Sequence, residues 1–334
     1  MEIPRHLFLF NMAPASTLQT SAAQENRHIT TQLQSNGFML DMSDKRLGWL
    51  TPTDPRLPTE ALREIFGKQG YLFLKGLIPA ESALEQRRHF FESYQGTTLL
   101  EPGTTPEQGI FSGEDPDAHS DLQINFYHKT TASVYDFAKR DDFLKFCQQS
   151  ALREFLLKFF GEEPFLYTRK IIRYNLPREE HSTAVHIDRT FLRDASPNLV
   201  SAWIPLGPAT VEMGSLMYLE GSHTIGIDME EDWKQVNRDL PHEEKINPYN
   251  VNMGEGGAIG KDAPAIAEKY DRRWLVADYE PGDVVLHTPY LIHSACQNQD
   301  TDMTIRLSTD LRFQPASETI SQRWLNDWAI GDKL

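Results

Sequence analysis

The first half of the chain carries apolar residues at helical spacing, interrupted by one short continuous apolar run. After Thr59, which suits a helix N-cap, apolar side chains recur three and four positions apart, and a pair of glycines then ends the pattern. The run Tyr71–Leu74 that follows is short and continuous, as in a buried strand. Two further helical stretches are expected over residues 81–94 and 141–160.

After residue 161 the pattern changes to short β-rich runs separated by turn residues. Many short strands of this kind are typical of an antiparallel double-sheet jelly roll, and the earlier helices would brace one of its faces. The sequence therefore predicts a mainly β fold with bracing helices. The expected strands cover residues 165–174, 185–188, 200–206, 215–219, 274–279, 284–286, 291–294 and 304–313.

Three segments do not fit these patterns. Residues 11 to about 50 are rich in Ala, Ser, Thr and Gln without clear periodicity, so we expect residues 1–55 to form an N-terminal arm that is mobile or loosely docked. Residues 56–334 then form a single domain. Within it, the Gly/Pro/Asp-rich loop 96–122 and the polar, acidic insert 225–272 are candidate lids, because long loops in compact domains are commonly functional covers.

Composition narrows the classes of partner. The formal charge of -15 disfavours a nucleic-acid partner or an anionic membrane surface, since both attract basic proteins. No apolar run approaches the roughly 18 residues of a membrane span, and the apolar patch at 7–10 is too brief for a secretory signal. Cys147 and Cys296 are isolated, as expected for reduced thiols in a cytoplasmic protein. A small-molecule partner is expected, and the sequence allows a homodimer without determining the oligomeric state.

The first chemical motif is His186-Ile187-Asp188. On a strand, alternate side chains point to the same face, so the imidazole and the carboxylate would project together. A second histidine would complete the 2-His-1-carboxylate set that non-haem Fe(II) uses, with positions left open for other ligands. The alternative is a hydrogen-bonded pair on a half-buried strand.

A second cluster follows the turn at residues 281–283. His293 ends an apolar run, where a histidine is either a ligand or a satisfied core residue, and His287 is the competing candidate. Arg306 and Ser308 would share a strand face, and an inward arginine beside a hydroxyl can hold a carboxylate by charge-assisted hydrogen bonds. A surface ion pair is the alternative role for the arginine.

Taken together, these stretches resemble the phytanoyl-CoA dioxygenase family of Fe(II)/2-oxoglutarate-dependent oxygenases. They occur in the order of the family over roughly residues 60–315. The matching stretches are residues 70–79, His186-Ile187-Asp188, residues 202–206, Gly214-Ser215-Leu216, Glu220-Gly221-Ser222-His223, residues 281–293 and Arg306-Leu307-Ser308.

The resemblance implies a double-stranded β-helix, a cupin-like jelly roll, and a set of site residues. His186, Asp188 and His293 match the iron ligands, so that His293 outranks His287. Arg306 matches the arginine that binds the distal carboxylate of 2-oxoglutarate, with Arg312 as the fallback because the spacing from His293 is slightly longer than is common. Ser308 matches the accompanying hydroxyl, Trp203 matches an aromatic residue near the site, and His223 belongs to a turn that is usually structural.

The resemblance also implies the reaction, in which 2-oxoglutarate and O2 are co-substrates and succinate and CO2 are released. A small metabolite would be hydroxylated, desaturated or rearranged, and the presence of Asp188 argues against halogenation. The acidic composition disfavours a CoA thioester, so we expect tailoring of a small, largely uncharged natural product. Two alternatives are a zinc-dependent hydrolase that uses the same ligands and a non-enzymatic jelly-roll binding module.

Overall fold

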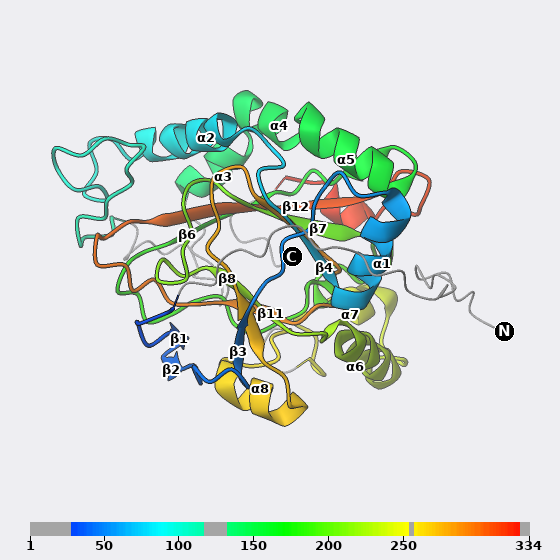
Figure 1. The fold of residues 1–334 in the computed structure, drawn as a ribbon. Helices are drawn as coiled ribbons and strands as arrows, with labels where there is room; N and C mark the ends of the chain where they lie inside the picture. The colour runs from blue at the N-terminus through cyan, green and yellow to red at the C-terminus, as the bar shows by residue number, and fades with distance from the viewer. Residues whose placement is uncertain (1–27, 117–131, 254–256, 328–334) are drawn as a thin grey trace.

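The computed structural model describes residues 28–116, 132–253 and 257–327, which form two facing sheets with helices outside them (Figure 1). The major sheet has six strands in the order β4-β10-β7-β12-β5, with β6 also paired to β12, and every pair in it is antiparallel. Its strands are β4 Tyr71–Leu74, β5 Pro164–Leu166, β6 Ile171–Asn175, β7 Val200–Pro205, β10 Val284–His287 and β12 Arg306–Pro315.

The minor sheet has four strands in the order β11-β8-β9-β3, and only its β3–β9 pair is parallel. Its strands are β3 Leu47–Trp49, β8 Leu216–Leu219, β9 Trp274–Val276 and β11 His293–Ala295. Tyr71 and Trp203 of the major sheet share one buried cluster with Tyr218 and Leu275 of the minor sheet, so the two sheets enclose a common interior. The predicted jelly-roll class is therefore confirmed.

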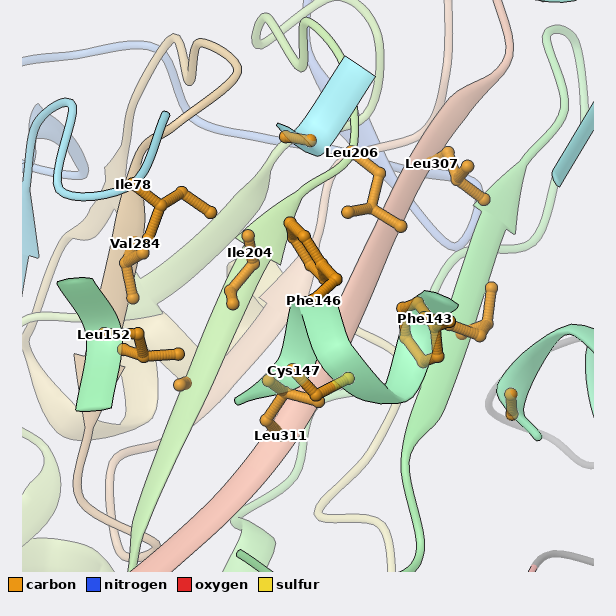
Figure 2. Close-up of a cluster of buried hydrophobic side chains, with 14 of the residues drawn as sticks. Ile78, Phe143, Phe146, Cys147, Leu152, Ile204, Leu206, Val284, Leu307 and Leu311 are labelled. Atoms are coloured by element: carbon orange, nitrogen blue, oxygen red, sulfur yellow. The ribbon is translucent and has the colours of Figure 1, made fainter. Parts of the chain in front are cut away.

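Helices cover the outer face of the major sheet because alternate residues of its strands are apolar on that side. Val284, Ile204 and Leu311 come from three neighbouring strands and pack with helix residues such as Phe146 and Leu152 (Figure 2). The covering helices are α1 Thr59–Gln69, α2 Ala80–Glu92, α3 Ala132–Ala138, α4 Asp141–Cys147 and α5 Ser150–Phe160. Residues on the opposite faces of the same strands point into the interior between the sheets.

The insert 225–272 is partly helical. It contains most of α6 His223–Val236, together with α7 His242–Ile246 and α8 Ala263–Tyr270. Helix α8 packs through Ala263 and Ile266 on the outer face of the minor sheet. Two 3-10 turns, η1 Asp188–Thr190 and η2 Gln322–Trp324, and a small hairpin of β1 Gln34–Ser35 and β2 Phe38–Met39 complete the described elements.

Several predicted elements differ in detail. The expected strand 165–174 is divided into β5 and β6, and the expected helix 141–160 is divided into α4 and α5. The expected strand 185–188 is not a strand. Only Val185 and His186 make isolated bridges, and η1 begins at Asp188. Side-chain contacts of Asp188, described below, decide that local geometry.

The described part of the predicted arm, residues 28–55, is packed against the domain. β3 is hydrogen-bonded along β9, and Leu33, Leu40 and Leu47 are buried in the cluster outside the minor sheet. These isolated leucines lie among polar residues, so the sequence shows no periodic pattern although each side chain has a buried position. The expectation of a mobile or loosely docked arm therefore does not fit residues 28–55, and residues 1–27 lie outside the described residues.

Among the residues that the structure describes, no helix combines the length and the apolar character that a membrane crossing needs.

Phe90 on α2 is expected to be a major contributor to stability. Its ring is fully buried and lies 5.2 to 5.8 Å from the rings of Phe91, Tyr94, Phe137 and Tyr174. Phe90→Ala should lower the free energy of unfolding by about 3–5 kcal/mol, because it leaves a cavity beneath the helical layer. Equilibrium urea unfolding measures the change.

The matched control is Phe38→Ala, since Phe38 is 40% exposed on the small hairpin. We expect this substitution to cost less than about 1 kcal/mol. Equal losses for the two variants would contradict the packing described for α2.

Candidate metal centre

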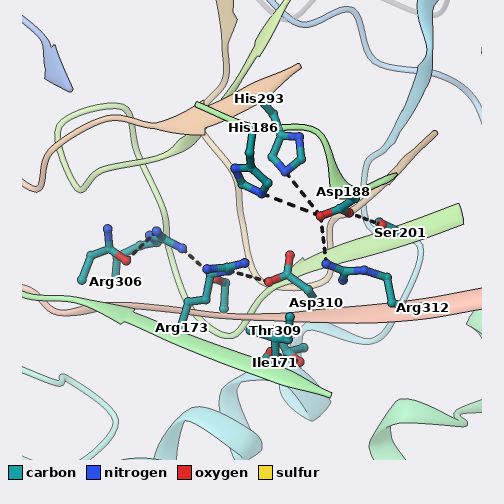
Figure 3. Close-up of polar contacts among 12 residues, drawn as sticks. Ile171, Arg173, His186, Asp188, Ser201, His293, Arg306, Thr309, Asp310 and Arg312 are labelled. Carbon is teal, nitrogen blue, oxygen red and sulfur yellow. Dashed lines mark hydrogen bonds and ion pairs between the residues drawn. The ribbon is translucent and has the colours of Figure 1, made fainter. Parts of the chain in front are cut away.

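His186 and His293 are brought together by a reciprocal pair of backbone hydrogen bonds. Each amide nitrogen lies 3.0 Å from the carbonyl oxygen of the other residue, and the two imidazole rings are 4.2 Å apart between centroids. Asp188 follows at the first residue of η1. Each of the three residues offers one ligand atom, and these atoms lie within 4.8 Å of one another, buried between the sheets (Figure 3).

Both histidines direct the same ring nitrogen, Nε2, toward the carboxylate of Asp188. Nδ1 of His186 lies 2.8 Å from the carbonyl oxygen of Ala184, and Nδ1 of His293 lies 2.8 Å from that of Leu291. Because a carbonyl oxygen only accepts, each Nδ1 carries the proton and each Nε2 has its lone pair free. The two Nε2 atoms lie 3.7 and 3.9 Å from Oδ1 of Asp188.

The charge states suit a divalent metal. Burial lowers the pKa of His293 well below its usual value, and the neighbouring His186 lowers it further, so the ring stays neutral. Burial opposes the ionisation of Asp188, but Arg312 and then the neighbouring imidazoles of His186 and His287 outweigh it and hold its pKa well below the usual range. Two neutral imidazoles and one carboxylate are the donor set that open non-haem Fe(II) sites use.

The carboxylate of Asp188 is oriented by residues from three strands of the major sheet. Its Oδ2 accepts hydrogen bonds from the hydroxyl of Ser201 on β7 and from Nε2 of His287 on β10, the latter at 3.2 Å. Its Oδ1, which faces the two histidines, lies 3.2 Å from Nη2 of Arg312 on β12. These contacts leave Oδ1 as the oxygen directed at the imidazoles.

His287, the competing candidate, lies beside the cluster but outside the set of converging ligand atoms. Because a carboxylate only accepts, Nε2 of His287 donates to Asp188, and Nδ1 is hydrogen-bonded to the hydroxyl of Tyr218 at 2.9 Å. Burial raises the pKa of Tyr218 well above its usual value, so this hydroxyl keeps its proton. Both ring nitrogens of His287 are thus already engaged.

Arg306 and Ser308 lie together on the interior face of β12, as the strand pattern predicts. Nη1 of Arg306 donates to the hydroxyl of Ser308 at 2.6 Å, and Nη2 donates to Oδ1 of Asn175 on β6 at 2.6 Å. The guanidinium carbon lies 5.9 Å from the ring of Trp203, and Nε has no hydrogen-bond partner among the described residues. Burial, with a smaller contribution from Arg173, lowers the pKa of Arg306 to about 10, so it remains charged at neutral pH.

An ion pair lies between Arg306 and Arg312 on the interior face of β12. Nε of Arg173 on β6 lies 2.6 Å from Oδ2 of Asp310 (Figure 3). Residues 306, 308, 310 and 312 alternate with Leu307 and Leu311, which face the helices. One strand therefore supplies both the polar lining of the interior and part of the apolar core.

Sequence reasoning singled out His287 and Arg312 but missed Ser201, which donates to Asp188, and Tyr218, which contacts His287. Their only signal in the sequence is that each occupies an inward position of a strand. Ser201 lies two residues before Trp203, and Tyr218 lies two residues after Leu216. Asn175 has the same inward register opposite Arg306. Their proximity depends on strand pairing, which the local sequence does not show.

His223 lies apart from the cluster. It begins α6, and its Nε2 lies 3.1 Å from the carbonyl oxygen of Gly67 on α1. Burial lowers its pKa, so the ring is neutral and donates one hydrogen bond that joins the two helices. This position agrees with the structural role that the resemblance implied.

The two candidate lids contact the site differently. In the insert, the carbonyl of Gly260 accepts from the amide of Val185 at 2.9 Å, and the amide of Ile259 donates to Val185 at 2.8 Å, directly beside His186. In the loop, the carbonyls of Glu107 and Gln108 accept hydrogen bonds from the buried Arg87, which also donates to the carbonyl of Ile305 before β12. Residues 117–122 of this loop lie outside the described residues.

Comparison with known proteins agrees with this geometry. Residues 66–306 match the family described as "Phytanoyl-CoA dioxygenase (PhyH)". A protein of Streptomyces arenae named 1-deoxypentalenic acid 11-beta-hydroxylase is 25% identical over 276 residues, which cover 80% of this chain and 86% of that protein. Its counterpart in Streptomyces exfoliatus is 24% identical over the same shares.

Solved structures with a similar fold include the epimerase SnoN in complex with Fe3+, alpha ketoglutarate and nogalamycin RO. It is 16% identical with a TM-score of 0.49, and the match covers 78% of this chain and 84% of that one. EctD from S. alaskensis with bound Fe is 14% identical with a TM-score of 0.48, over 84% and 85% of the two chains.

The match at 66–306 includes the three converging ligand atoms and most strands of both sheets, and it ends at Arg306. This protein belongs to the phytanoyl-CoA dioxygenase family and is an Fe(II)- and 2-oxoglutarate-dependent oxygenase.

Proposed function

We propose that His186, Asp188 and His293 hold the ferrous ion of this oxygenase. The observation that carries the proposal is the convergence of two unprotonated Nε2 atoms and one ionised carboxylate oxygen within 4.8 Å. Two independent backbone carbonyls set the histidine tautomers, and residues of three strands orient the carboxylate. Three protein ligands on one side of the ion leave the other positions for the co-substrates.

Arg306 and Ser308 are the proposed anchor for the distal carboxylate of 2-oxoglutarate. Arg306 is 1% exposed, so water does not compete strongly for its guanidinium, and charge-assisted hydrogen bonds to a carboxylate are favoured there. Its Nε has no partner among the described residues, and Ser308 holds Nη1 in position. Trp203 limits the movement of the guanidinium from one side.

An iron ion held by these residues would supply the oxidising chemistry, with 2-oxoglutarate and O2 as co-substrates that are converted to succinate and CO2. The residues of the chain position the reactants and exclude water. Ser201 and His287 keep Oδ2 of Asp188 engaged, so that Oδ1 remains directed at the metal position. The insert is the stronger candidate for a cover, because its backbone is hydrogen-bonded to Val185 beside a metal ligand.

The proposed main reaction is hydroxylation of a small natural product. The two hydroxylases of Streptomyces match this chain over most of its length, and each is named for hydroxylation of 1-deoxypentalenic acid. Two-fifths of the sequence is hydrophobic and the net charge is -15, so a highly anionic CoA thioester remains a poor substrate candidate. A hydrolytic role has less support, because His287, the nearest additional base, has both ring nitrogens engaged.

Asp188→Ala tests the ligand assignment. Without the carboxylate, the ion loses one ligand and the compensation of its charge, so we expect weaker Fe(II) binding and no measurable succinate release from 2-oxoglutarate. Anaerobic Fe(II) titration and a succinate assay measure the two effects. Asp232→Ala, on the exposed side of α6, is the matched control. Full succinate production by the Asp188→Ala enzyme would refute the assignment.

Arg306→Gln tests the co-substrate anchor. Loss of a charge-assisted contact to a carboxylate should raise the KM for 2-oxoglutarate by about tenfold to a hundredfold. Steady-state kinetics with varied 2-oxoglutarate give the value, and Arg88→Gln on the surface of α2 serves as the control. If Arg312→Gln raised this KM and Arg306→Gln did not, the anchor would be Arg312.

His287→Gln tests whether His287 positions the proposed ligand Asp188 or is itself an iron ligand. We expect the affinity for Fe(II) to fall by about tenfold to a hundredfold, because the carboxylate loses one of its two Oδ2 partners. His293→Ala should abolish stoichiometric Fe(II) binding, while His242→Gln, at an exposed position, should leave it unchanged. If His287→Gln abolished Fe(II) binding and His293→Ala only weakened it, His287 would be the ligand and His293 the positioning residue.

A further inference from the structure

Arg312 is a buried cation whose hydrogen-bonding capacity is largely unused. It is 3% exposed and lies on the interior face of β12, opposite Ser201 of β7. Nη2 contacts Oδ1 of Asp188 at 3.2 Å, whereas Nε and Nη1 have no hydrogen-bond partner among the described residues. Burying guanidinium donors without a partner is unfavourable, so this position suits a ligand that supplies an acceptor.

The role of Arg312 is separate from that of Arg306. Arg306 and Arg312 are six residue steps apart along β12 (312 - 306 = 6), and a strand rises about 3.3 Å per residue, so their Cα atoms are about 20 Å apart. The Arg173–Asp310 ion pair lies between them (Figure 3). A co-substrate that extends from the metal position toward Arg306 therefore leaves Arg312, beside Asp188, available to a second molecule.

The charged side chains that line this part of the interior carry a net positive charge. The charged side chains on the inner faces of β6 and β12, together with Asp188, comprise three guanidiniums and two carboxylates, a balance of one positive charge (3 - 2 = 1). They are Arg173, Arg306, Arg312, Asp188 and Asp310. A ferrous ion and a 2-oxoglutarate dianion carry equal and opposite charges, so binding both does not change this balance.

From this geometry we infer that the main substrate is a monoanion, in practice a carboxylic acid, whose carboxylate binds Nε and Nη1 of Arg312. The inference rests on the proposed function, because it places the substrate beside the proposed metal ligands. It also revises the expectation of a largely uncharged metabolite, which came from the composition of the whole chain. The half-buried ring of Phe191, 5.9 Å from His186, provides apolar surface near the metal ligands for the body of such an acid.

The test compares an acid with its neutral isostere on the full-length enzyme loaded anaerobically with Fe(II) and 2-oxoglutarate. Cyclohexanecarboxylate and cyclohexanecarboxamide have the same apolar body and differ in charge. Isothermal titration calorimetry should show that the carboxylate binds at least about tenfold more tightly than the amide, as expected for charge-assisted hydrogen bonds to a buried guanidinium.

Variants assign this preference to one residue. Arg312→Gln should reduce the preference for the acid to less than about twofold, Arg312→Lys should retain part of it, and Arg88→Gln should leave it unchanged. Retained binding of 2-oxoglutarate by Arg312→Gln, measured in the same titrations, shows that the variant is folded and that the co-substrate site is separate. The wild-type comparison of acid and amide does not depend on any variant.

Equal affinities for acid and amide in the wild-type enzyme, including no measurable binding of either, would overturn the inference. So would an acid preference that persists in Arg312→Gln. Succinate release by the wild-type enzyme in the absence of a main substrate is measured first. If it occurs and the acid preference does not, the inference about Arg312 fails alone, whereas failure to bind Fe(II) and 2-oxoglutarate would remove the proposed function itself.

Discussion

The centre of this protein depends on one buried carboxylate. An ionised Asp188 that is 3% exposed is stable only if several donors compensate its charge. Ser201, His287 and Arg312 provide them, and they come from β7, β10 and β12 of the major sheet. The orientation of the proposed iron ligand therefore requires that these three strands pair. The same contacts explain why the extended backbone ends before Asp188 and a 3-10 turn begins.

The two histidines are positioned by the backbone. His186 and His293 exchange hydrogen bonds through their main chains, and each ring donates Nδ1–H to the carbonyl two residues earlier. The tautomers therefore do not depend on other side chains, which could vary without changing the nitrogen offered to the metal. Side chains of the major sheet orient the carboxylate, and main-chain bonds orient the imidazoles.

Strand β12 contributes both to the stability of the fold and to the lining of the site. Leu307 and Leu311 pack into the helix-covered core, while Arg306, Ser308, Asp310 and Arg312 line the interior. A shift of the strand by one residue would exchange these sets and bury four polar groups among phenylalanines. The apolar packing that stabilises the domain thus also fixes which arginines face the interior, where the proposed metal ligands lie. The net charge of -15 is that of the whole chain, whereas the charged residues of β6 and β12 that line the interior include more guanidiniums than carboxylates.

Much of the organisation could be predicted from the chain alone. The spacing of apolar residues indicated the jelly-roll class and the helical layer. Burial of one face repeats apolar residues about every two positions in a strand and about every four in a helix. The ordered motifs led to the family and singled out His186, Asp188, His293, Arg306 and Ser308. Errors occurred where local pattern and tertiary contact disagree, as in the expected strand 185–188 and in residues 28–55, whose separate leucines pack on the minor sheet.

The sequence by itself determined the family, the fold class and the residue types available for chemistry, since these follow from spacing and order along the chain. Only the tertiary structure decided which oxygen of Asp188 faces the imidazoles, that His287 supports this carboxylate, and that Arg312 has unused donors beside it. The physical reason is that these properties belong to atoms brought together by strand pairing across long sequence separations. The spacing of residues along the chain does not indicate which partners a buried charge contacts in the folded protein.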